Sequence, residues 1–263
     1  MAKCSEECAS VSRCDIFDFM AKYVGMTVVH PGGFNATNEL LNRLKINQNS
    51  HVIDIACGKG TSALHIAKRY GCMVTAIDIS PELIEEARHL ASKRDITKRV
   101  NFLVCDAMKL PFEDNFFDAA ISQAMLVLVD DKIQAINEAK RVVKKGGTAG
   151  WLELSWKNEP TEEFLDYVSN VLCSYCMRKA ETYEGWKEVF RKAGVQEVDI
   201  IRNTFKNSGV LHMLKDEGLA NTMKILLRYI GNSDVRKRMN LISEAFTKYP
   251  QYFGYGIYSF TKA

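Results

Sequence analysis

The chain has 263 residues, of which 47% are hydrophobic, and its 35 basic and 32 acidic side chains give a formal net charge of +3. This length and composition allow a large folded core and exclude an intrinsically disordered protein. The charges are spread along the whole chain, which indicates no polyanionic partner, and no apolar run reaches the roughly 18 residues that a membrane span requires.

The amino-terminal residues Met1 to Ser12 lack the apolar core of a signal peptide, so we expect a cytoplasmic protein.

Eight cysteines in such a chain predict reduced thiols rather than a disulfide framework. Five of them fall in two segments, residues 1–45 and 157–180: Cys4, Cys8, Cys14, Cys173 and Cys176. The last two form a C-x-x-C in a segment predicted to be helical, where this spacing places both thiols on one face. Burial as small apolar residues is the usual role of such cysteines, and a thiol or metalloid site is the alternative. We predict no metal site.

Short β-branched apolar runs alternate with helical periodicity between His51 and Lys157, which is typical of a parallel sheet covered by helices. The predicted strands are His51–Ala56, Met73–Asp78, Val100–Cys105, Phe117–Gln123 and Thr148–Ser155. The predicted crossover helices are Thr61–Tyr70, Pro81–Arg94 and Ile133–Val143. Ser80 caps the second helix, whereas Gly71 ends the first and Gly146-Gly147 end the third.

A further helix is predicted at Trp186–Ala193, followed by strands at Val195–Arg202 and Tyr255–Lys262 that could form an antiparallel edge pair. The predicted fold is therefore α/β, with a Rossmann-like, seven-stranded, mostly parallel sheet and helices on both faces. Three segments lie outside this sheet: Cys14–Arg43, Lys157–Ala180 and Asn207–Tyr249. We expect them to form a helical lid over the carboxyl ends of the strands, where open α/β sheets bind ligands. The chain then divides into residues 1–45, an amino-terminal lid segment, and residues 46–263, a domain with insertions at about 157–180 and 207–249.

The first predicted strand runs into a glycine loop that opens a helix: Ile53-Asp54-Ile55-Ala56-Cys57-Gly58-Lys59-Gly60-Thr61. Glycines let the backbone pass close to a ligand, and a helix amino terminus favours a carboxylate. The next strand ends in Asp78, at about the distance from the loop at which nucleotide-binding βαβ units place an acid on ribose hydroxyls. These features alone also fit a nicotinamide dehydrogenase.

Three further motifs follow in order along the chain. Cys105-Asp106-Ala107 ends the third strand, Leu110-Pro111-Phe112-Glu113-Asp114-Asn115-Phe116-Phe117-Asp118 leads into the fourth, and Lys144-Lys145-Gly146-Gly147 precedes the fifth. Over about His51 to Leu154 the set resembles class I S-adenosylmethionine-dependent methyltransferases, in particular the type 11-like group related to the ubiquinone and menaquinone biosynthesis C-methyltransferases. The resemblance implies S-adenosyl-L-methionine as the cofactor and disfavours the dehydrogenase.

The resemblance also implies roles for residues at the strand ends. The implied cofactor-binding residues are Asp54, Ala56, Gly58, Gly60, Asp78, Ile79, Asp106, Ala107 and Gln123. The loop residues would line the methionine part of the cofactor, with Asp54 ordering the loop, and Asp78 would accept hydrogen bonds from the ribose hydroxyls. Ile79, Asp106 and Ala107 would contact the adenine. Gln123 would face the methionine end or the acceptor. Ala56 departs from the family pattern because it replaces the first glycine of the usual G-x-G-x-G run.

Methyl transfer requires an acceptor held in line with the methyl carbon, exclusion of water and, for a hydroxyl or carbon acid, a base. The candidate catalytic residues are His30, which precedes Pro31-Gly32-Gly33, His212 in the late insertion, and Glu153 at the end of the fifth strand. Each has a structural alternative, as a capping or partly exposed histidine or as an acid that caps the next turn. Five aromatic residues could line an apolar or cationic acceptor or could simply pack in the core: Tyr23, Trp156, Tyr183, Trp186 and Tyr252.

We therefore predict a methyltransferase that acts on a small or medium-sized molecule in an enclosed pocket, without a membrane or nucleic-acid partner. The alternatives are a macromolecular (RNA or protein) methyltransferase and a catalytically inactive S-adenosylmethionine-binding regulatory protein. The densest basic cluster, Lys93, Arg94, Lys98 and Arg99, indicates a solvated helix end rather than a nucleic-acid footprint, which usually covers a whole face.

Overall fold

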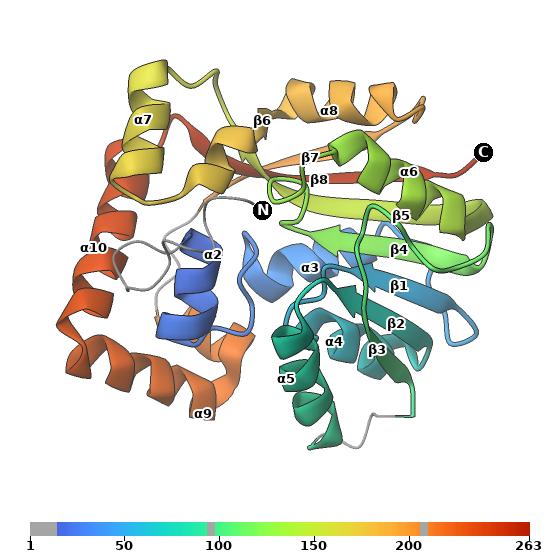
Figure 1. The fold of residues 1–263 in the computed structure, drawn as a ribbon, viewed down its shortest axis with the longest axis horizontal. Coiled ribbons are helices and arrows are strands. Elements are labelled where there is room, and N and C mark those ends of the chain that lie inside the picture. The colour runs from blue at the N-terminus through green and yellow to red at the C-terminus, as the bar shows by residue number, and fades with distance from the viewer. Residues whose placement is uncertain (1–14, 94–97, 206–209) are drawn as a thin grey trace.

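The computed structural model describes residues 15–93, 98–205 and 210–263, and its centre is a sheet in the order β3-β2-β1-β4-β5-β8-β7 (Figure 1). The strands are β1 His51–Ile55, β2 Met73–Asp78, β3 Val100–Val104, β4 Phe117–Gln123, β5 Val143–Trp156, β6 Glu181–Thr182, β7 Asp199–Thr204 and β8 Phe253–Thr261. β1 to β5 are parallel, and β8 runs antiparallel to both β5 and β7. The predicted mostly parallel sheet is confirmed. It has eight strands rather than seven because the two-residue β6 pairs with the end of β5.

Helices cover both faces of the sheet because side chains of a buried strand alternate between two apolar layers. On β1, Val52 packs in the layer under α3, α4 and α5, whereas Ile53 packs in the layer under α6 and α8. These helices span α3 Gly33–Leu41, α4 Thr61–Tyr70, α5 Pro81–Ser92, α6 Lys132–Val142 and α8 Tyr183–Lys192. As predicted, the Ser80 side chain caps α5 by accepting a hydrogen bond from Leu83 N (3.3 Å).

Several predicted boundaries differ from the structure, and two of the differences have a clear physical cause. α6 ends at Val142, and Gly146-Gly147 lie inside β5 instead of ending the helix. A Cβ at Gly147 would lie 2.7 Å from the carbonyl oxygen of Asp118, so glycine allows β5 to approach β4 closely where their register shifts. β7 starts at Asp199 rather than Val195, because the amide of Val195 still donates to Phe190 O of α8 (3.0 Å).

The described residues of the three segments predicted as a lid form seven helical elements that lie beside one another. They are α2 Ile16–Asp18, the π-helix η1 Phe19–Val24, α3, α7 Glu162–Asn170, the 3-10 helix η2 Tyr175–Lys179, α9 Val210–Gly231 and α10 Ser233–Lys248. Figure 1 shows α2, α9 and α10 beyond one end of the sheet. Asp216 and Glu217 of α9 bind backbone amides of the amino-terminal segment, and α9 is interrupted at Gly218 (φ 72°, ψ 166°). Below, these elements are called the lid segments.

The predicted helix through the C-x-x-C is wrong. Cys173 has a positive φ of 49° in the turn between α7 and η2, so the two thiols do not share one helix face. The buried Cys176 thiol instead donates to Asp15 Oδ1 (3.4 Å), which joins η2 to the start of α2. Cys4, Cys8 and Cys14 lie outside the described residues. Within the part of the chain that the structure describes, no helix has the length and apolar character needed to cross a membrane.

Candidate active site

The glycine loop joins β1 to α4 in a backbone conformation that few side chains tolerate. Ala56, Gly58 and Gly60 all have positive φ, of 61°, 54° and 73°. A Cβ at Gly60 would lie 2.5 Å from the Phe102 ring, so the loop also passes close to β3. The N-cap residue of α4, Gly60, has no side chain to cap the helix, so the first-turn amides other than that of Ala63, which faces Asp54, are available to an anionic ligand group. Ala56 therefore adopts the left-handed conformation that the family's usual glycine would adopt more easily.

Asp54 lies buried beneath this loop. Burial and the nearby Asp78 carboxylate raise its pKa to about 7, and the Ala63 amide of α4 partly offsets that increase. Its Oδ2 has no hydrogen-bond partner among the described residues. A buried carboxylate oxygen of this kind can order a water molecule or a polar ligand group beside the loop.

Asp78 at the end of β2 faces the same loop. Its Oδ2 accepts a hydrogen bond from Gly58 N (2.9 Å), and its Oδ1 accepts one from Ser80 N (3.0 Å). Burial raises the pKa of this carboxyl, and these amides act against the increase. The next residue, Ile79, leaves 47% of its surface exposed at the strand end. A carboxylate beside an exposed apolar side chain suits a ligand that has both hydroxyl groups and a flat ring.

Asp106 and Ala107 follow β3, the neighbouring strand. The amide of Cys105 donates to the carbonyl of Asp78 (2.9 Å), so the ends of β2 and β3 meet. Asp106 Oδ1 accepts from Met108 N (2.8 Å), which fixes a tight turn and leaves both residues partly exposed. The predicted cofactor residues other than Gln123 therefore lie at the carboxyl ends of three adjacent strands, β1, β2 and β3, and Gln123 ends the next strand, β4.

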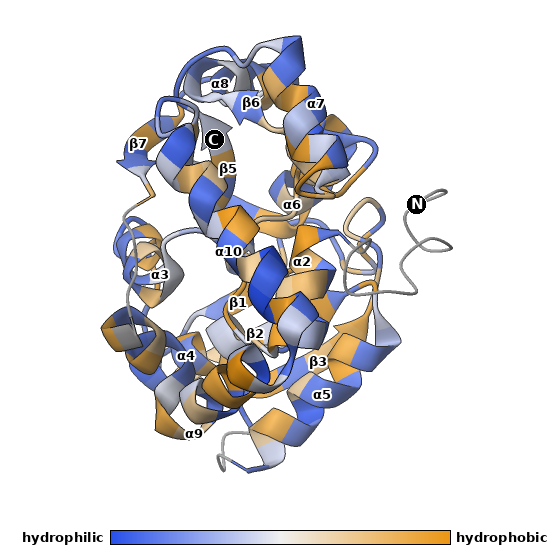
Figure 2. Cartoon of the chain, turned by 90° about the vertical axis from the view of Figure 1, so that its left-hand side faces the viewer, coloured by the Kyte–Doolittle hydropathy of each residue, from blue (hydrophilic) through white to orange (hydrophobic). Residues whose placement is uncertain are grey.

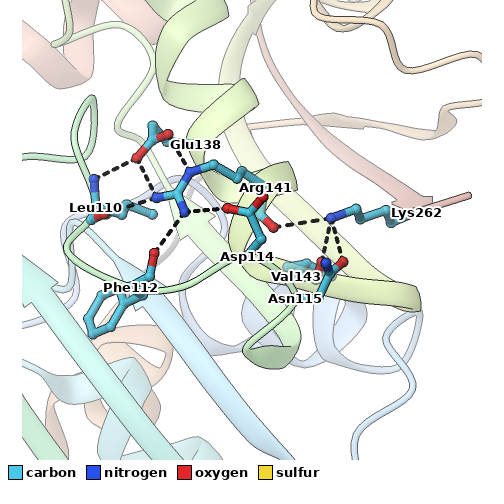
Figure 3. Close-up of polar contacts among 8 residues, drawn as sticks. All are labelled: Leu110, Phe112, Asp114, Asn115, Glu138, Arg141, Val143 and Lys262. Carbon is cyan, nitrogen blue, oxygen red and sulfur yellow. Dashed lines mark hydrogen bonds and ion pairs between the residues drawn. The ribbon is translucent and has the colours of Figure 1, made fainter.

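An arginine holds the next motif, residues 110–118, against α6 (Figure 3). The Arg141 guanidinium donates to the carbonyls of Leu110 and Phe112 (2.9 and 2.7 Å) and to the Asp114 carboxylate (2.8 Å). Glu138 orients the guanidinium through two further bonds and accepts from Leu110 N. Leu110, Phe112 and Asp114 thus hold the loop after Asp106 in place through their bonds to Arg141. In this network they have a structural role rather than a ligand-binding one.

His30 and Gln123, distant in sequence, meet at the end of β4. Nε2 of His30 lies 3.3 Å from Nε2 of Gln123 and 3.2 Å from the Thr37 hydroxyl, while Gln123 donates to Thr37 Oγ1 (2.9 Å). Nδ1 of His30 lies 3.3 Å from the carbonyl of Pro31, which can only accept a hydrogen bond. The Gln123 amide nitrogen can only donate. Both partners therefore specify the same neutral tautomer, with the proton on Nδ1 and a lone pair on Nε2.

The electrostatics agree with a neutral ring. Burial lowers the pKa of His30 to about 4, although its contact with the Pro31 carbonyl acts in the other direction. The imidazole is therefore uncharged at neutral pH and can accept a proton at Nε2. Thr37 was not among the residues predicted from sequence. No local sequence signal identifies it, because it reaches this cluster only through the packing of α3.

The other two candidate bases lie elsewhere. Glu153 is fully buried on β5, and its Oε1 accepts hydrogen bonds from Met125 N and Leu126 N (3.1 and 3.0 Å). Burial raises its pKa to about 8. Glu153 therefore stabilises the loop after β4 by accepting hydrogen bonds from its amides, which is the structural role considered above as the alternative to catalysis. His212 on α9 lies 3.4 Å from the exposed side chain of Asn35, apart from the His30 cluster.

The five aromatic residues proposed as a wall make their ring contacts at different places in the core, although Tyr23, Trp156, Trp186 and Tyr252 all belong to one large hydrophobic cluster. Tyr23 stacks on Phe19, and Trp156 and Tyr252 pack on Phe164. Tyr183 and Trp186 belong to the first turn of α8, and each donates a hydrogen bond to a backbone carbonyl of the sheet. Burial in the core is thus their role. Among residues 15–93, 98–205 and 210–263, no group of three His, Cys, Asp or Glu side chains could hold a metal ion.

Two contacts that sequence inspection missed join the amino-terminal segment to the glycine loop. Lys59 Nζ donates to the Ala21 carbonyl of η1 (3.0 Å), and the Thr61 hydroxyl donates to the Thr27 carbonyl (3.0 Å). Thr27 in turn binds Glu217 of α9 through its amide and hydroxyl. The lid segments are therefore connected to the loop by hydrogen bonds that run from α9 to the start of α4.

Comparison with known proteins identifies relatives of the whole chain and of its central part. Residues 53–149 match the protein family described as "Methyltransferase domain". An uncharacterized protein of Haemophilus influenzae is 30% identical over 218 residues, which covers 80% of this chain and 83% of that protein. Norajmaline N-methyltransferase of Rauvolfia serpentina is 28% identical over 163 residues, 59% of this chain, and the match spans 56% of that enzyme's length.

A similar fold occurs in a solved structure with bound ligands. Haemonchus contortus phosphoethanolamine N-methyltransferase 2, in complex with phosphomonomethylethanolamine and S-adenosylhomocysteine, superimposes with a TM-score of 0.72. The similarity covers 92% of this chain and 56% of that chain, at 21% sequence identity. At 21% sequence identity, this similarity shows a shared fold and not a shared substrate.

Proposed function

Because this chain belongs to the class I S-adenosylmethionine-dependent methyltransferases, we propose that it methylates a small organic molecule bound between its strand ends and its lid segments. The observation that carries this proposal is the alignment of the glycine loop, Asp78 and Asp106 at three adjacent strand ends. Open α/β sheets bind nucleotide-like ligands at this edge, next to the point where the strand order reverses between β1 and β4.

The residues present fit the methyl donor. The uncapped start of α4 suits the carboxylate of its methionine part, and the unpartnered Oδ2 of Asp54 can order a polar group beside the loop. Asp78 would accept hydrogen bonds from the ribose hydroxyls, with Ile79 against the adenine and Asp106 on its amino group. S-adenosylmethionine, when bound, supplies an electrophilic methyl group on a sulfonium.

The chain's own contribution to transfer is to orient the acceptor and to accept its proton. When an acceptor displaces the Gln123 amide, the uncharged Nε2 of His30 can take a proton from a hydroxyl, an amine or a carbon acid, while the contact of Nδ1 with the Pro31 carbonyl fixes the ring. Glu153 cannot do this, because its carboxyl is buried against the amides of the loop after β4. We therefore assign the base role to His30 alone among the three candidates. Oxygen, nitrogen, carbon and sulfur acceptors all remain compatible with the site.

A small acceptor fits better than a macromolecule. The lid segments are joined to the glycine loop through Lys59 and Thr61, so a polymer that entered at this end of the sheet would have to displace them. Lys98 and Arg99 of the basic cluster lie at the start of β3, at the opposite edge of the sheet, whereas Arg94 lies outside the described residues. The N-methyltransferase of Rauvolfia serpentina, by its name, acts on a small molecule.

Calorimetric titration with S-adenosylmethionine, S-adenosylhomocysteine and NAD tests the donor site, and a screen of small-molecule pools for S-adenosylhomocysteine formation tests turnover. We expect binding of the first two ligands and turnover with at least one pool. Binding of NAD alone would contradict the family assignment. Donor binding without turnover in any pool would instead favour a regulatory protein.

A further inference from the structure

A threonine hydroxyl contacts His30, the base that the proposed function assigns. Thr37 is fully buried on α3, the helix that follows His30 in the chain. The other buried residues of this helix have no polar side-chain group: Gly33, Ala36, Leu40 and Leu41. Figure 2, which faces the lid segments, shows α3 with both hydrophobic (orange) and hydrophilic (blue) residues. A polar group on a buried helix face needs hydrogen-bond partners, and those of Thr37 are residues of the candidate site and its own helix.

Three polar groups surround the Thr37 hydroxyl. It lies 2.9 Å from Nε2 of Gln123, 3.2 Å from Nε2 of His30 and 3.3 Å from the carbonyl oxygen of Gly33. A hydroxyl offers one hydrogen and two lone pairs. The Gln123 amide nitrogen can only donate, so it binds one of the lone pairs. The single hydrogen can therefore point either to Nε2 of His30 or to the Gly33 carbonyl.

The protonation state of His30 decides between these two positions. An unprotonated Nε2 can only accept, so the hydroxyl donates to it. A protonated Nε2 can only donate, so it binds the second lone pair of the hydroxyl, and the hydrogen turns to the Gly33 carbonyl. That carbonyl does not depend on the hydroxyl, because the Thr37 amide is its regular helical partner. Rotation about one C–O bond thus lets Thr37 pair with both forms of the ring.

We propose that Thr37 is a positioning residue for proton transfer: its hydroxyl releases the lone pair of His30 to the methyl acceptor and then accepts a hydrogen bond from the protonated ring. This role rests on the proposed function. In the transfer step, the bond between the acceptor atom and its hydrogen breaks, and the proton goes to Nε2. The freed electron pair forms the bond to the methyl carbon, and the electron pair of the sulfur–methyl bond stays on sulfur. The positive charge first carried by the sulfonium therefore ends on the imidazole.

Burial makes a partner for this charge necessary. Burial opposes a charged imidazole and holds the pKa of His30 at about 4. Nδ1 already faces the Pro31 carbonyl, so the proton gained at Nε2 needs a hydrogen-bond acceptor of its own. Of the two polar side chains beside Nε2, Gln123 presents a donor nitrogen, whereas the Thr37 oxygen can accept. Hydrogen bonds to charged groups are stronger than those between neutral groups, so Thr37 should favour the protonated ring.

Four substitutions separate this role from simple packing. Thr37→Val keeps the branched shape of threonine and removes the hydroxyl, Thr37→Ala removes both, and Thr37→Ser keeps the hydroxyl. The chain also offers a matched control in Thr75, a buried residue of β2 whose hydroxyl lies 2.9 Å from Nε2 of His51. His51 is the first residue of β1, at the other end of the strand from the glycine loop. Thr75→Val therefore removes the same type of contact away from the candidate site.

Nitrogen-15 NMR of the full-length, histidine-labelled protein tests the contact without a methyl acceptor. An imidazole nitrogen that accepts a hydrogen bond resonates at a different frequency from one that does not. We expect the Nε2 resonance of His30, assigned through His30→Gln, to move in Thr37→Val and Thr37→Ala and to stay near its original position in Thr37→Ser. Thr75→Val should move only the His51 resonance. An unchanged His30 resonance in Thr37→Val and Thr37→Ala would overturn the inference.

Rates measured with the small-molecule pool that supports turnover of the unsubstituted protein test the role. Thr37→Val should lower kcat by about tenfold or more, Thr37→Ser should restore most of it, and Thr75→Val should have no effect. Calorimetry should give the same S-adenosylmethionine affinity for all of them. An unchanged kcat in Thr37→Val, or an equal loss in Thr75→Val, would overturn the inference and leave the proposed function standing. Absence of turnover by the unsubstituted protein in every pool would contradict the proposed function, and this role with it.

Discussion

Nε2 of His30 lies 3.3 Å from the side-chain nitrogen of Gln123, so a residue of the amino-terminal segment meets the end of β4. The contact joins a lid segment to the sheet beside the topological switch point, where open α/β sheets bind ligands. Because a glutamine amide nitrogen only donates hydrogen bonds, it keeps Nε2 of the imidazole unprotonated. The ring that could accept a proton is therefore held as a neutral base before any ligand binds.

The low pKa of His30 predicts how stability depends on pH. The unfolded chain has the ordinary histidine pKa of 6.5, whereas burial lowers the folded value to about 4. Between these values the unfolded state binds more protons, so the free energy of unfolding should rise with pH, by up to about 3 kcal/mol. His30→Gln should remove this part of the slope. Urea unfolding of both proteins between pH 4 and 7 measures it, and identical slopes would show that His30 titrates normally.

Substitution of His30 should also affect turnover. If Nε2 accepts the acceptor's proton, His30→Gln should lower kcat by about 100-fold or more while leaving S-adenosylmethionine affinity unchanged. His212→Gln, on the exposed surface of α9, serves as the matched control. Calorimetry gives the affinity and S-adenosylhomocysteine release gives the rate. Equal rates for the two variants would assign the base to another residue or show that no base is needed.

Asp78 should dominate affinity for the methyl donor. Loss of charged hydrogen bonds to two ribose hydroxyls in Asp78→Ala should raise Kd by about 100-fold. Asp118→Ala is the control, because that carboxylate also binds a backbone amide, His51 N at 2.7 Å, but lies at the amino end of β4. Calorimetric titration of both variants measures the effect. A comparable loss in Asp118→Ala would indicate general damage to the fold rather than loss of a ribose contact.

Much of the fold could be predicted from local sequence patterns. The bounds of β2, β4 and α4 match the predicted ranges. In each of them the apolar residues recur at the spacing of a strand or a helix, and a glycine or a polar residue stands where the element ends. Gly146-Gly147 misled the prediction because glycine has two uses, as a helix stop and as a site of close backbone approach. Only the position of β4 relative to β5 decides between them.

The candidate site was predictable only in part. Strand ends are visible in the sequence, which is why Asp78 and Asp106 could be placed side by side. The alternation of side chains along a strand shows which face a residue points to but not what lies over that face. The sequence therefore could not show whether Glu153 faces a ligand pocket or, as the structure shows, binds the backbone amides of Met125 and Leu126. The Thr37 contact depends on α3 packing against the sheet, which no local pattern encodes.

Ala56 should be under backbone strain. An alanine at φ 61° costs about 1–2 kcal/mol, and Ala56→Gly relieves that cost but loses about 0.5–1 kcal/mol through unfolded-state entropy. We expect a net stabilisation of about 0.5–1 kcal/mol, measured by chemical denaturation. Ala120→Gly, in the regular part of β4, should instead destabilise by about 1 kcal/mol. Destabilisation by both substitutions would mean that the Ala56 methyl group contributes to packing.

Glu153 should oppose His30 in the pH dependence of stability. Burial raises its pKa to about 8 in the folded protein, so between the ordinary value of 4.5 and 8 the folded state binds more protons. This contribution to stability is fully present below about pH 4.5 and is lost as pH rises to 8. Glu153→Gln keeps an oxygen that can accept from Met125 N and Leu126 N but cannot ionise. It should raise the melting temperature at pH 8 and change it little at pH 5; the reverse pattern would show that the carboxylate itself is needed.

Arg141 and Arg191 form a natural matched pair for measuring what holds the loop at residues 110–118. Each pairs through two bonds with a glutamate three residues earlier, Glu138 or Glu188. Only Arg141 also binds backbone carbonyls of the loop, and removing it leaves those buried acceptors and Glu138 without their partner. Exposed ion pairs contribute little to stability, about 0–1 kcal/mol, whereas loss of several charge-assisted hydrogen bonds costs about 2–3 kcal/mol.

We therefore expect Arg141→Ala to destabilise the protein by about 2–3 kcal/mol and Arg191→Ala to have almost no effect. Because the loop follows Asp106, Arg141→Ala should also weaken S-adenosylmethionine binding at a temperature where the variant remains folded. Denaturant titration gives the first quantity, and calorimetry gives the second. Equal destabilisation by the two substitutions would show that the glutamate pair, rather than the backbone carbonyls, carries the effect. Loss of stability with unchanged affinity would separate the loop from the adenine site.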